Sequence, residues 1–254
     1  MLLVARPSET FIDRPTLDAG YSARQAAEAS ASFDAQNHSN SHRDPHDLPD
    51  FSDSNPHTSP VLFLPPLLSS LPHGLSHTPA PSPDQPPLTT ETHLPNIDPA
   101  SLSLHKALHY FSPVNPYYAT QLYAESFNWD SLKLPEDDER EWYVVAFRSR
   151  RRPESDSGSL YEADRRAHEE AVQNGGLIMY WYGIPDSEGN NLATCIWQSR
   201  RHAIAANSRP NHIVAARLAA ASFEAYVLER HVIRKVKGET GITVEPYTGG
   251  DVGW

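Results

Sequence analysis

Short runs of apolar and aromatic residues recur in the second half of the chain and predict β-strands. Three runs rich in β-branched and aromatic side chains lie at 142–147, 177–182 and 192–197. Residues 183–190 are rich in turn-forming residues, so the last two runs are expected to form a hairpin. A fourth, shorter strand is expected at 241–246, just after a glycine.

Segments with helical spacing separate these runs. Ser159, with Glu162 three residues later, has the pattern of a capping box and predicts a helix that ends at Gly175 and Gly176. The other helices are expected at 102–110, at 117–127, from Ser199 to a break at 207–210, and at 211–237. The order from residue 142 onwards is therefore β-α-β-β-α-β, which predicts an α+β, ferredoxin-like fold with two helices on one face of an antiparallel sheet.

The strands are apolar on both faces. In the first strand Trp142 and Val144 point one way and Tyr143 and Val145 the other, whereas a sheet covered on one face should alternate apolar and polar residues. The helices can cover one face only. The other must meet a second sheet, a ligand or the segment at 60–127. Two such sheets closing face to face would form a dimeric α/β barrel, so a homodimer is expected.

The first hundred residues differ in composition from the rest. They hold 16 of the 23 prolines, and proline blocks both helices and ladders. We therefore expect a disordered tail at 1–95, a helical extension at 96–130 and the α+β domain at 131–254. The segment at 60–72 is too apolar to remain in water, and is expected to dock on the domain's own surface or on a partner.

The net charge and the cysteine content restrict the class of protein to which the chain can belong. The net charge is −11, of which residues 101–254 carry −3, so no broad basic field favours nucleic acid. One cysteine excludes a disulfide within the chain, and no run of 18 apolar residues could span a membrane. A cytoplasmic protein is expected, with the nucleus as an alternative. His38, His42 and His46 are interrupted by Pro45, so no metal site is expected there. No cofactor is expected either.

Four long motifs resemble a fungal family of uncharacterised proteins. They are Glu141-Trp-Tyr-Val-Val-Ala-Phe-Arg-Ser, Tyr180-Trp-Tyr-Gly-Ile-Pro, Cys195-Ile-Trp-Gln-Ser-Arg-Arg-His-Ala and Pro246-Tyr-Thr-Gly-Gly-Asp-Val-Gly-Trp. The resemblance spans about residues 95–254 and implies no activity. The order of elements is also similar to the dimeric α/β-barrel group, which includes small monooxygenases, polyketide cyclases and haem enzymes. That second resemblance is topological and brings no catalytic motif.

Aromatic and basic residues near the hairpin are the candidates for chemistry. Tyr180, Tyr182 and Trp197 could line a flat apolar ligand pocket, or could simply fill a core or a dimer interface. His202 and His212 flank the helix break and are candidate general bases, with structural capping as the alternative. The arginines that could hold a carboxylate or enolate beside them are Arg200, Arg201 and Arg209.

Two functions follow from these candidates. One is a small cofactor-independent enzyme, similar to a monooxygenase or cyclase, that binds an apolar or aromatic metabolite. The other is a non-catalytic binding or scaffold protein that uses its proline-rich tail. A cavity of roughly 300 Å³ or more bounded by Tyr180, Tyr182, Trp197 and His202 would favour the enzyme. A solid core there would favour the scaffold.

Overall fold

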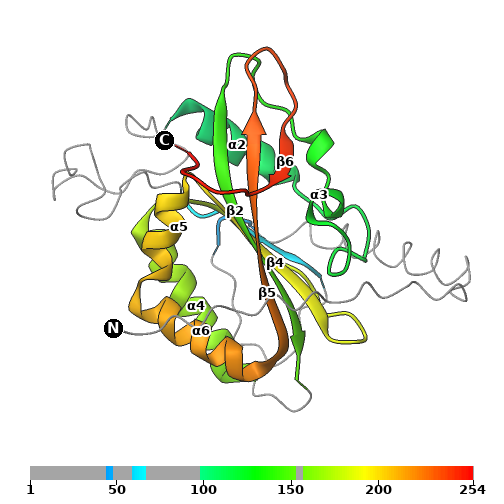
Figure 1. The fold of residues 1–254 in the computed structure, drawn as a ribbon, viewed down its shortest axis with the longest axis vertical. Helices are drawn as coiled ribbons and strands as arrows, with labels where there is room; N and C mark the ends of the chain where they lie inside the picture. The colour runs from blue at the N-terminus through cyan, green and yellow to red at the C-terminus, as the bar shows by residue number, and fades with distance from the viewer. Residues whose placement is uncertain (1–43, 48–58, 67–97, 153–156, 254) are drawn as a thin grey trace, which may run out of the picture.

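A computed structural model describes residues 44–47, 59–66, 98–152 and 157–253, and Figure 1 shows the arrangement of their elements. The helical elements are α2 (Pro99–Ala107), η1 (Leu108–Tyr110), α3 (Tyr123–Ser126), η2 (Trp129–Ser131), α4 (Ser157–Asn174), α5 (Arg200–Asn207) and α6 (Pro210–Ser222). The strands are β1 (Val61–Phe63), β2 (Arg140–Arg151), β3 (Leu177–Tyr182), β4 (Asn190–Trp197), β5 (Phe223–Lys235) and β6 (Thr243–Pro246). Most of the expected tail, including His38 and His42, lies outside the described residues.

The six strands form one antiparallel sheet in the order β1-β3-β4-β2-β5-β6. Its four central strands, taken with α4, α5 and α6, follow the chain order β-α-β-β-α-β, which confirms the ferredoxin-like α+β class. Figure 1 shows α4, α5 and α6 gathered at the lower left of the sheet, away from α2 and α3. The two edge strands, β1 and β6, extend this four-stranded core.

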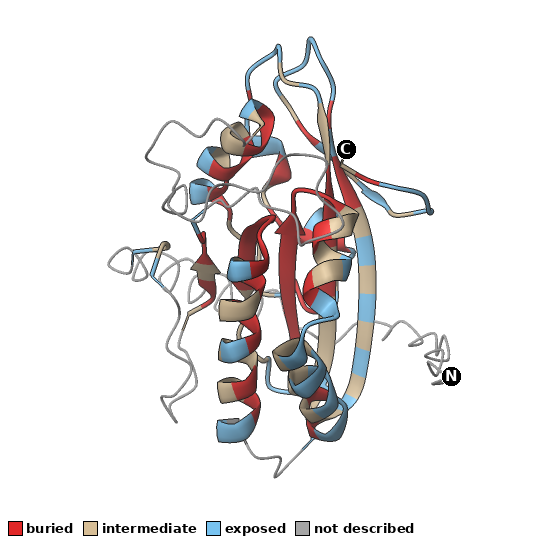
Figure 2. Cartoon of the chain, turned by 90° about the vertical axis from the view of Figure 1, so that its left-hand side faces the viewer, coloured by how far each residue is buried: buried red, intermediate tan, exposed pale blue. Residues whose placement is uncertain are grey.

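The prediction of one long helix at 211–237 is wrong beyond residue 222. Helix α6 ends at Ser222, and Phe223–Lys235 continue without a loop as β5, which pairs with the whole length of β2. The segment contains β-branched and aromatic residues, and its exposure alternates residue by residue, the period of a strand. The alternation is visible along β5 in Figure 2. The strand expected at 241–246 is consequently the edge strand β6.

The second face of the sheet is covered by the chain itself. Trp142 and Trp181 pack in one buried cluster with residues of the segment before β2. The members of that covering segment include Leu64, Leu104, Leu108, Phe111, Tyr118, Tyr123 and Phe127. The Trp142 indole donates to the Ser101 hydroxyl at 2.9 Å, and Tyr123 shares a hydrogen bond of 2.7 Å with Thr194. Of the covers expected for this face, the structure therefore shows the chain's own segment.

The apolar segment near residue 60 docks on the sheet. Val61–Phe63 pair with β3 as an edge strand, with Val61 opposite Tyr182. Leu64 is fully buried, and its backbone carbonyl and that of Pro65 contact the imidazoles of His46 and His105. The described part of the segment therefore lies against the sheet of the same chain.

The helix expected at 117–127 is reduced to α3, four residues long. The side chain of Arg148 explains the difference. Its guanidinium donates to the backbone oxygens of Tyr118, Ala119 and Gln121 at 2.6–3.1 Å, while Nε pairs with Glu229 at 2.6 Å. Carbonyls bound to the half-buried Arg148 are not available for helical hydrogen bonds, so this stretch folds as turns instead.

Candidate functional site

A cavity of about 330 Å³ lies between the sheet and helices α4, α5 and α6. Two rows of paired residues cross its sheet side. Tyr180, Cys195, Val145 and Arg230 are successive cross-strand partners in the first row. The second row consists of Tyr182, Ala193, Phe147 and Leu228. Partners in an antiparallel sheet point to the same face, so both rows face the helices.

The size of the cavity follows from the residues on the helices. Six of those that line it are alanines, namely Ala167, Ala171, Ala203, Ala215, Ala216 and Ala219. Because alanine side chains are small, they leave space between the helices and the aromatic residues of the sheet. Protein interiors are normally packed without such voids, so a cavity of this size is the strongest sign of a ligand site in the described residues.

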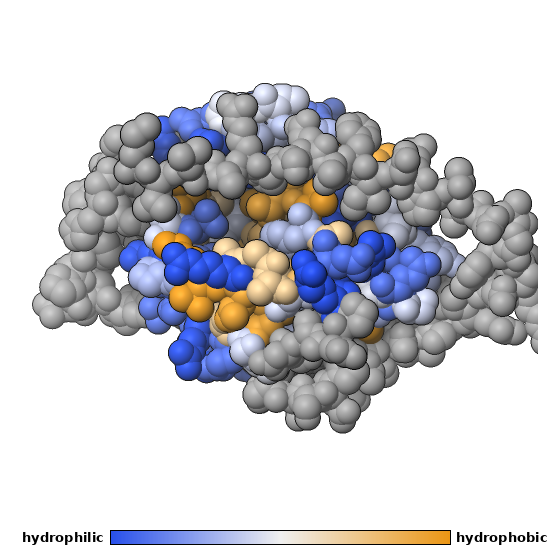
Figure 3. Space-filling view, turned by 60° about the horizontal axis from the view of Figure 1, so that its bottom comes forward, coloured by the Kyte–Doolittle hydropathy of each residue, from blue (hydrophilic) through white to orange (hydrophobic). Residues whose placement is uncertain are grey.

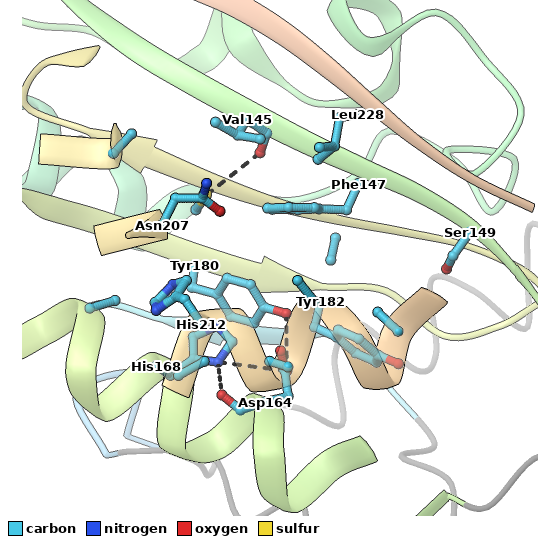
Figure 4. A pocket seen from close by; sticks show the side chains of 18 of the residues that line it. Val145, Phe147, Ser149, Asp164, His168, Tyr180, Tyr182, Asn207, His212 and Leu228 are labelled. Carbon is cyan, nitrogen blue, oxygen red and sulfur yellow. Dashed lines mark hydrogen bonds and ion pairs between the residues drawn. The ribbon is translucent and has the colours of Figure 1, made fainter. Parts of the chain in front are cut away.

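Asp164, His168 and Tyr180 form a polar group at one end of the cavity (Figure 4). Asp164 and His168 are four residues apart on α4 and therefore lie on the same side of that helix. Nδ1 of His168 lies 2.7 Å from the backbone oxygen of Asp164 and 3.6 Å from its Oδ2. The Tyr180 hydroxyl donates to Oδ2 at 3.5 Å, and the Tyr180 ring packs edge-on against the imidazole.

His212 brings a second imidazole to the same cavity from α6. Its backbone N–H donates to Oε2 of Glu170 at 3.1 Å, and its Nδ1 lies 3.4 Å from the same oxygen. Glu170, from α4, therefore satisfies a backbone N–H in the first turn of α6 as well as pairing with the side chain. Burial lowers the pKa of His212, and the nearby Glu170 opposes that shift, so a neutral imidazole is favoured at neutral pH.

The phenols and the thiol along the sheet are uncharged at neutral pH. Burial raises the pKa of Tyr180 well above its ordinary value, and the Asp164 carboxylate adds to the effect. Burial likewise raises the pKa of Tyr182 and brings that of Cys195 to about 12. Tyr180 and Tyr182 can therefore donate hydrogen bonds to a ligand, whereas Cys195 is a thiol and not a nucleophilic thiolate.

The structure brings together four of the residues singled out from the sequence. Tyr180, Tyr182, Trp197 and His212 all line the cavity. His202 does not line it. That side chain is fully buried beside Gly176, with Nδ1 2.8 Å from the Ser199 hydroxyl.

The three arginines expected beside the histidines are not among the cavity-lining residues. Arg201 forms an ion pair of 3.0 Å with Asp251. Arg200 lies 3.9 Å from Asp251 and packs over the Tyr247 ring, and Arg209 donates to Asn174 at 3.4 Å. Arg200 and Arg201 thus contact the C-terminal segment instead of the cavity.

Neither Asp164 nor His168 was among the candidates selected from the sequence. A signal was present, because Leu160, Ala167 and Ala171 share the helical face of these two residues and are all buried. An Asp and a His four residues apart within an apolar stripe are expected to face the interior. The neighbouring arginines and glutamates make this apolar stripe hard to recognise in the sequence. They lie on the outer side of α4, where they form ion pairs with one another.

The cavity opens to solvent between α5 and β5. Ile204, Tyr226 and Leu228 line it and are also exposed, so they form the rim of an entrance. Hydrophobic surface between hydrophilic residues is also visible at the lower end of the molecule (Figure 3). Within the described residues, no group of three acidic, histidine or cysteine side chains is placed to hold a metal ion. No helix in the same ranges is long and apolar enough to cross a membrane.

Residues 84–246 match the PB2B2.08-like family. The chain belongs to this family. A curated relative, the UPF0643 protein PB2B2.08 of the fission yeast Schizosaccharomyces pombe, is 49% identical over 67 residues. That match spans 24% of this chain and 30% of the relative, so the chain covers less than a third of that protein. The expected fungal family is confirmed.

Solved structures with a similar arrangement share little sequence with the chain. SnoaB, a cofactor-independent oxygenase from Streptomyces nogalater, is 12% identical with a TM-score of 0.29, covering 37% of this chain and 90% of its own. An anthrone oxidase-like protein is 15% identical with a TM-score of 0.30, covering 38% of this chain and 45% of its own. Because both scores lie below 0.5, neither activity is transferred to this chain.

Proposed function

We propose that the protein binds a flat, apolar small molecule between the sheet and helices α4, α5 and α6, and acts on it without a cofactor. The cavity of about 330 Å³ carries this proposal. Its walls are largely aliphatic and aromatic, and its polar groups are concentrated at a few points, which is the usual composition of a small-molecule site. The scaffold alternative depends on the proline-rich tail, most of which lies outside the described ranges.

Proton abstraction is the chemistry that the polar end of the cavity supports. A hydrogen bond from Nδ1 of His168 to the backbone oxygen of Asp164 leaves the lone pair on Nε2. In the proposed step, an acidic O–H or C–H of the ligand gives its proton to Nε2, and the electron pair stays on the ligand. The Asp164 carboxylate then stabilises the imidazolium, and the Tyr180 hydroxyl turns from Asp164 to donate its one proton to the new anion.

Ligand binding is tested by filling the cavity. Ala215→Phe places a large ring in it, whereas Ala220→Phe places the same ring at an exposed position of the same helix that does not line it. Fluorescence titration with phenylnaphthylamine, a neutral aromatic probe, should show binding to the native chain and to the Ala220→Phe variant. Binding should fall at least about tenfold in the Ala215→Phe variant. Equal binding to both variants would overturn the proposed site.

Proton abstraction is tested with a probe whose colour reports ionisation. Nitrophenol bound beside His168 should be ionised to a greater extent than free nitrophenol at the same pH, as measured by visible absorption. His168→Gln should abolish the excess ionisation while leaving probe affinity within about threefold. Nitroanisole has no acidic proton and serves as the control. Binding without excess ionisation would leave a binding protein rather than a catalyst.

A homodimer and a cytoplasmic location are part of the same proposal. The sheet face once expected to pair with a second copy is occupied by Leu104, Phe111 and other residues of the chain itself. A homodimer would therefore use another surface. Sedimentation of the full chain tests the first expectation, and fluorescence imaging of a tagged chain tests the second.

A further inference from the structure

The two ends of the cavity carry opposite charge. Tyr180, beside Asp164, begins the row of paired residues that crosses β3, β4, β2 and β5, and Arg230 ends it. Three strand spacings of about 4.8 Å place the Cα atoms of Tyr180 and Arg230 roughly 14 Å apart. Between them lie only Cys195 and Val145, which are small. A ligand lying along this row would meet a carboxylate at one end and a guanidinium at the other.

The backbone oxygen of Arg230 accepts from the Tyr247 N–H, but its guanidinium has no ion-pair partner among the described residues. Its neighbours on β5 form ion pairs, since Glu229 binds Arg148 and Arg234 binds Glu141. By contrast, no carboxylate in the described ranges lies within ion-pair distance of Arg230. The side chain is exposed, and it lines the cavity. An unpaired arginine at the rim of an apolar cavity is suited to binding an anion.

Further donors surround this end of the cavity. Tyr143 lines it and lies close enough to Arg230 and Arg200 for both to lower the pKa of its phenol. Burial outweighs them and raises that pKa overall, so the hydroxyl remains a donor at neutral pH. The Tyr247 ring packs edge-on against Tyr143 at 5.4 Å and lies beneath Arg200 at 5.9 Å. Near this group, a carboxylate oxygen of Asp251 lies 3.9 Å from Arg200.

We propose that Arg230 and Tyr143 bind an anionic group of the ligand, which makes the ligand of the proposed function an elongated apolar or aromatic acid. The acid group lies at the β5 edge, and the atom that loses a proton lies at the Asp164–His168 end. This orientation is set by charge, because the Asp164 carboxylate repels the acid group from the far end. The assignment rests on the proposed function, since it concerns the same cavity.

Two probes that differ only in an acid group test this assignment. Anilinonaphthalene sulfonate carries a sulfonate that phenylnaphthylamine lacks, and both report binding by fluorescence. Arg230→Gln should weaken binding of the sulfonate probe about tenfold or more, because a charge-assisted contact is lost, and should leave the neutral probe within twofold. Arg234→Gln, on the same strand but paired with Glu141 and outside the cavity, is the control and should change neither affinity.

The outcomes separate the two proposals. If neither probe binds in a way that Ala215→Phe blocks, the proposed function fails. If both probes bind in the cavity but Arg230→Gln affects them equally, the cavity stands and the acid-binding assignment is overturned. Selective loss of the sulfonate probe, with a native affinity that falls as salt is added, supports the assignment.

Discussion

Gly176 and His202 share one small space where α4 turns into β3. Gly176 has a φ of +82°, and a Cβ added to it would lie 2.1 Å from Cγ of the His202 ring. Two side chains cannot occupy that space, because Cγ is close to the backbone of α5 and cannot swing away. The His202 imidazole therefore fills the space between the end of α4 and the start of α5, and this explains why it lies outside the cavity.

Gly176→Ala should consequently destabilise the fold by about 4 kcal/mol or more, because steric overlap adds to backbone strain. Gly238→Ala is the matched control. Its φ is +88°, but nothing lies within 4 Å of an added Cβ, so only the strain of about 1 kcal/mol applies. Urea denaturation of both variants measures the difference. Similar losses in the two would contradict the close approach to His202.

At the scale of elements, buried histidines join the chain segments and make their docking depend on pH. His105 on α2 contacts the Pro65 carbonyl at 3.2 Å, and burial lowers its pKa to about 4, with His46 and His109 adding repulsion and Asp44 facing His109. Burial also lowers the pKa of His202 to about 4, with repulsion from Arg140. Both are therefore neutral in the folded chain.

Stability should fall as the solution is acidified. In the unfolded chain these imidazoles take up protons below about pH 6.5, whereas in the folded chain they do so only near about pH 4. Their contribution is complete above the unfolded pKa and is lost progressively between the two values, by about 2 kcal/mol for each histidine at about pH 5. Urea denaturation at about pH 7.5 and about pH 5 measures the loss. His105→Gln, which keeps a donor for Pro65, should reduce it by about half, and an unchanged loss would contradict this account.

The elements differ in how well the sequence predicted them. Strands β3 and β4, and the start of α5 next to Ser199, agree because local propensity and tertiary packing favour the same structure. The prediction is wrong for the segments after Ser222 and near Tyr118, because contacts with residues distant in the sequence determine their structure. Residues 223–235 become a strand by pairing with β2, and Arg148 binds the carbonyls near Tyr118. Neither contact is visible in local periodicity.

The candidate site shows the same limit. The aromatic residues of the hairpin were found because strand alternation fixes the side to which a side chain points. The face of a residue near a helix end depends on how the helix packs, so His202 and His212 could not be told apart from spacing. Arg230 escaped notice because its segment was interpreted as helix, which changes the face on which every side chain lies.

At the scale of the whole molecule, the sheet is enclosed between two layers of the same chain. Helices α4, α5 and α6 lie on one face and leave the cavity, while residues of the segment from Pro99 to Leu134 pack in a buried cluster on the other face. The sequence predicted that both faces need cover but could not choose between a second copy and the chain itself. Large side chains such as Trp142 and Trp181 would be exposed if this second layer were removed.

Leu104→Arg tests the role of that layer. Leu104 on α2 is fully buried in the cluster that covers the sheet, so an arginine there must either bury an unpaired charge or displace the helix. The variant should lose about 4 kcal/mol or more of unfolding free energy and should associate, because the apolar face around Trp142 becomes available to a second copy. Leu122→Arg, in the same segment but 58% exposed, should change stability by no more than about 0.5 kcal/mol and should sediment as the native chain does. Denaturation and sedimentation velocity measure the two effects. Native stability and sedimentation of the Leu104→Arg variant would mean that the segment is not what keeps this face of the sheet covered.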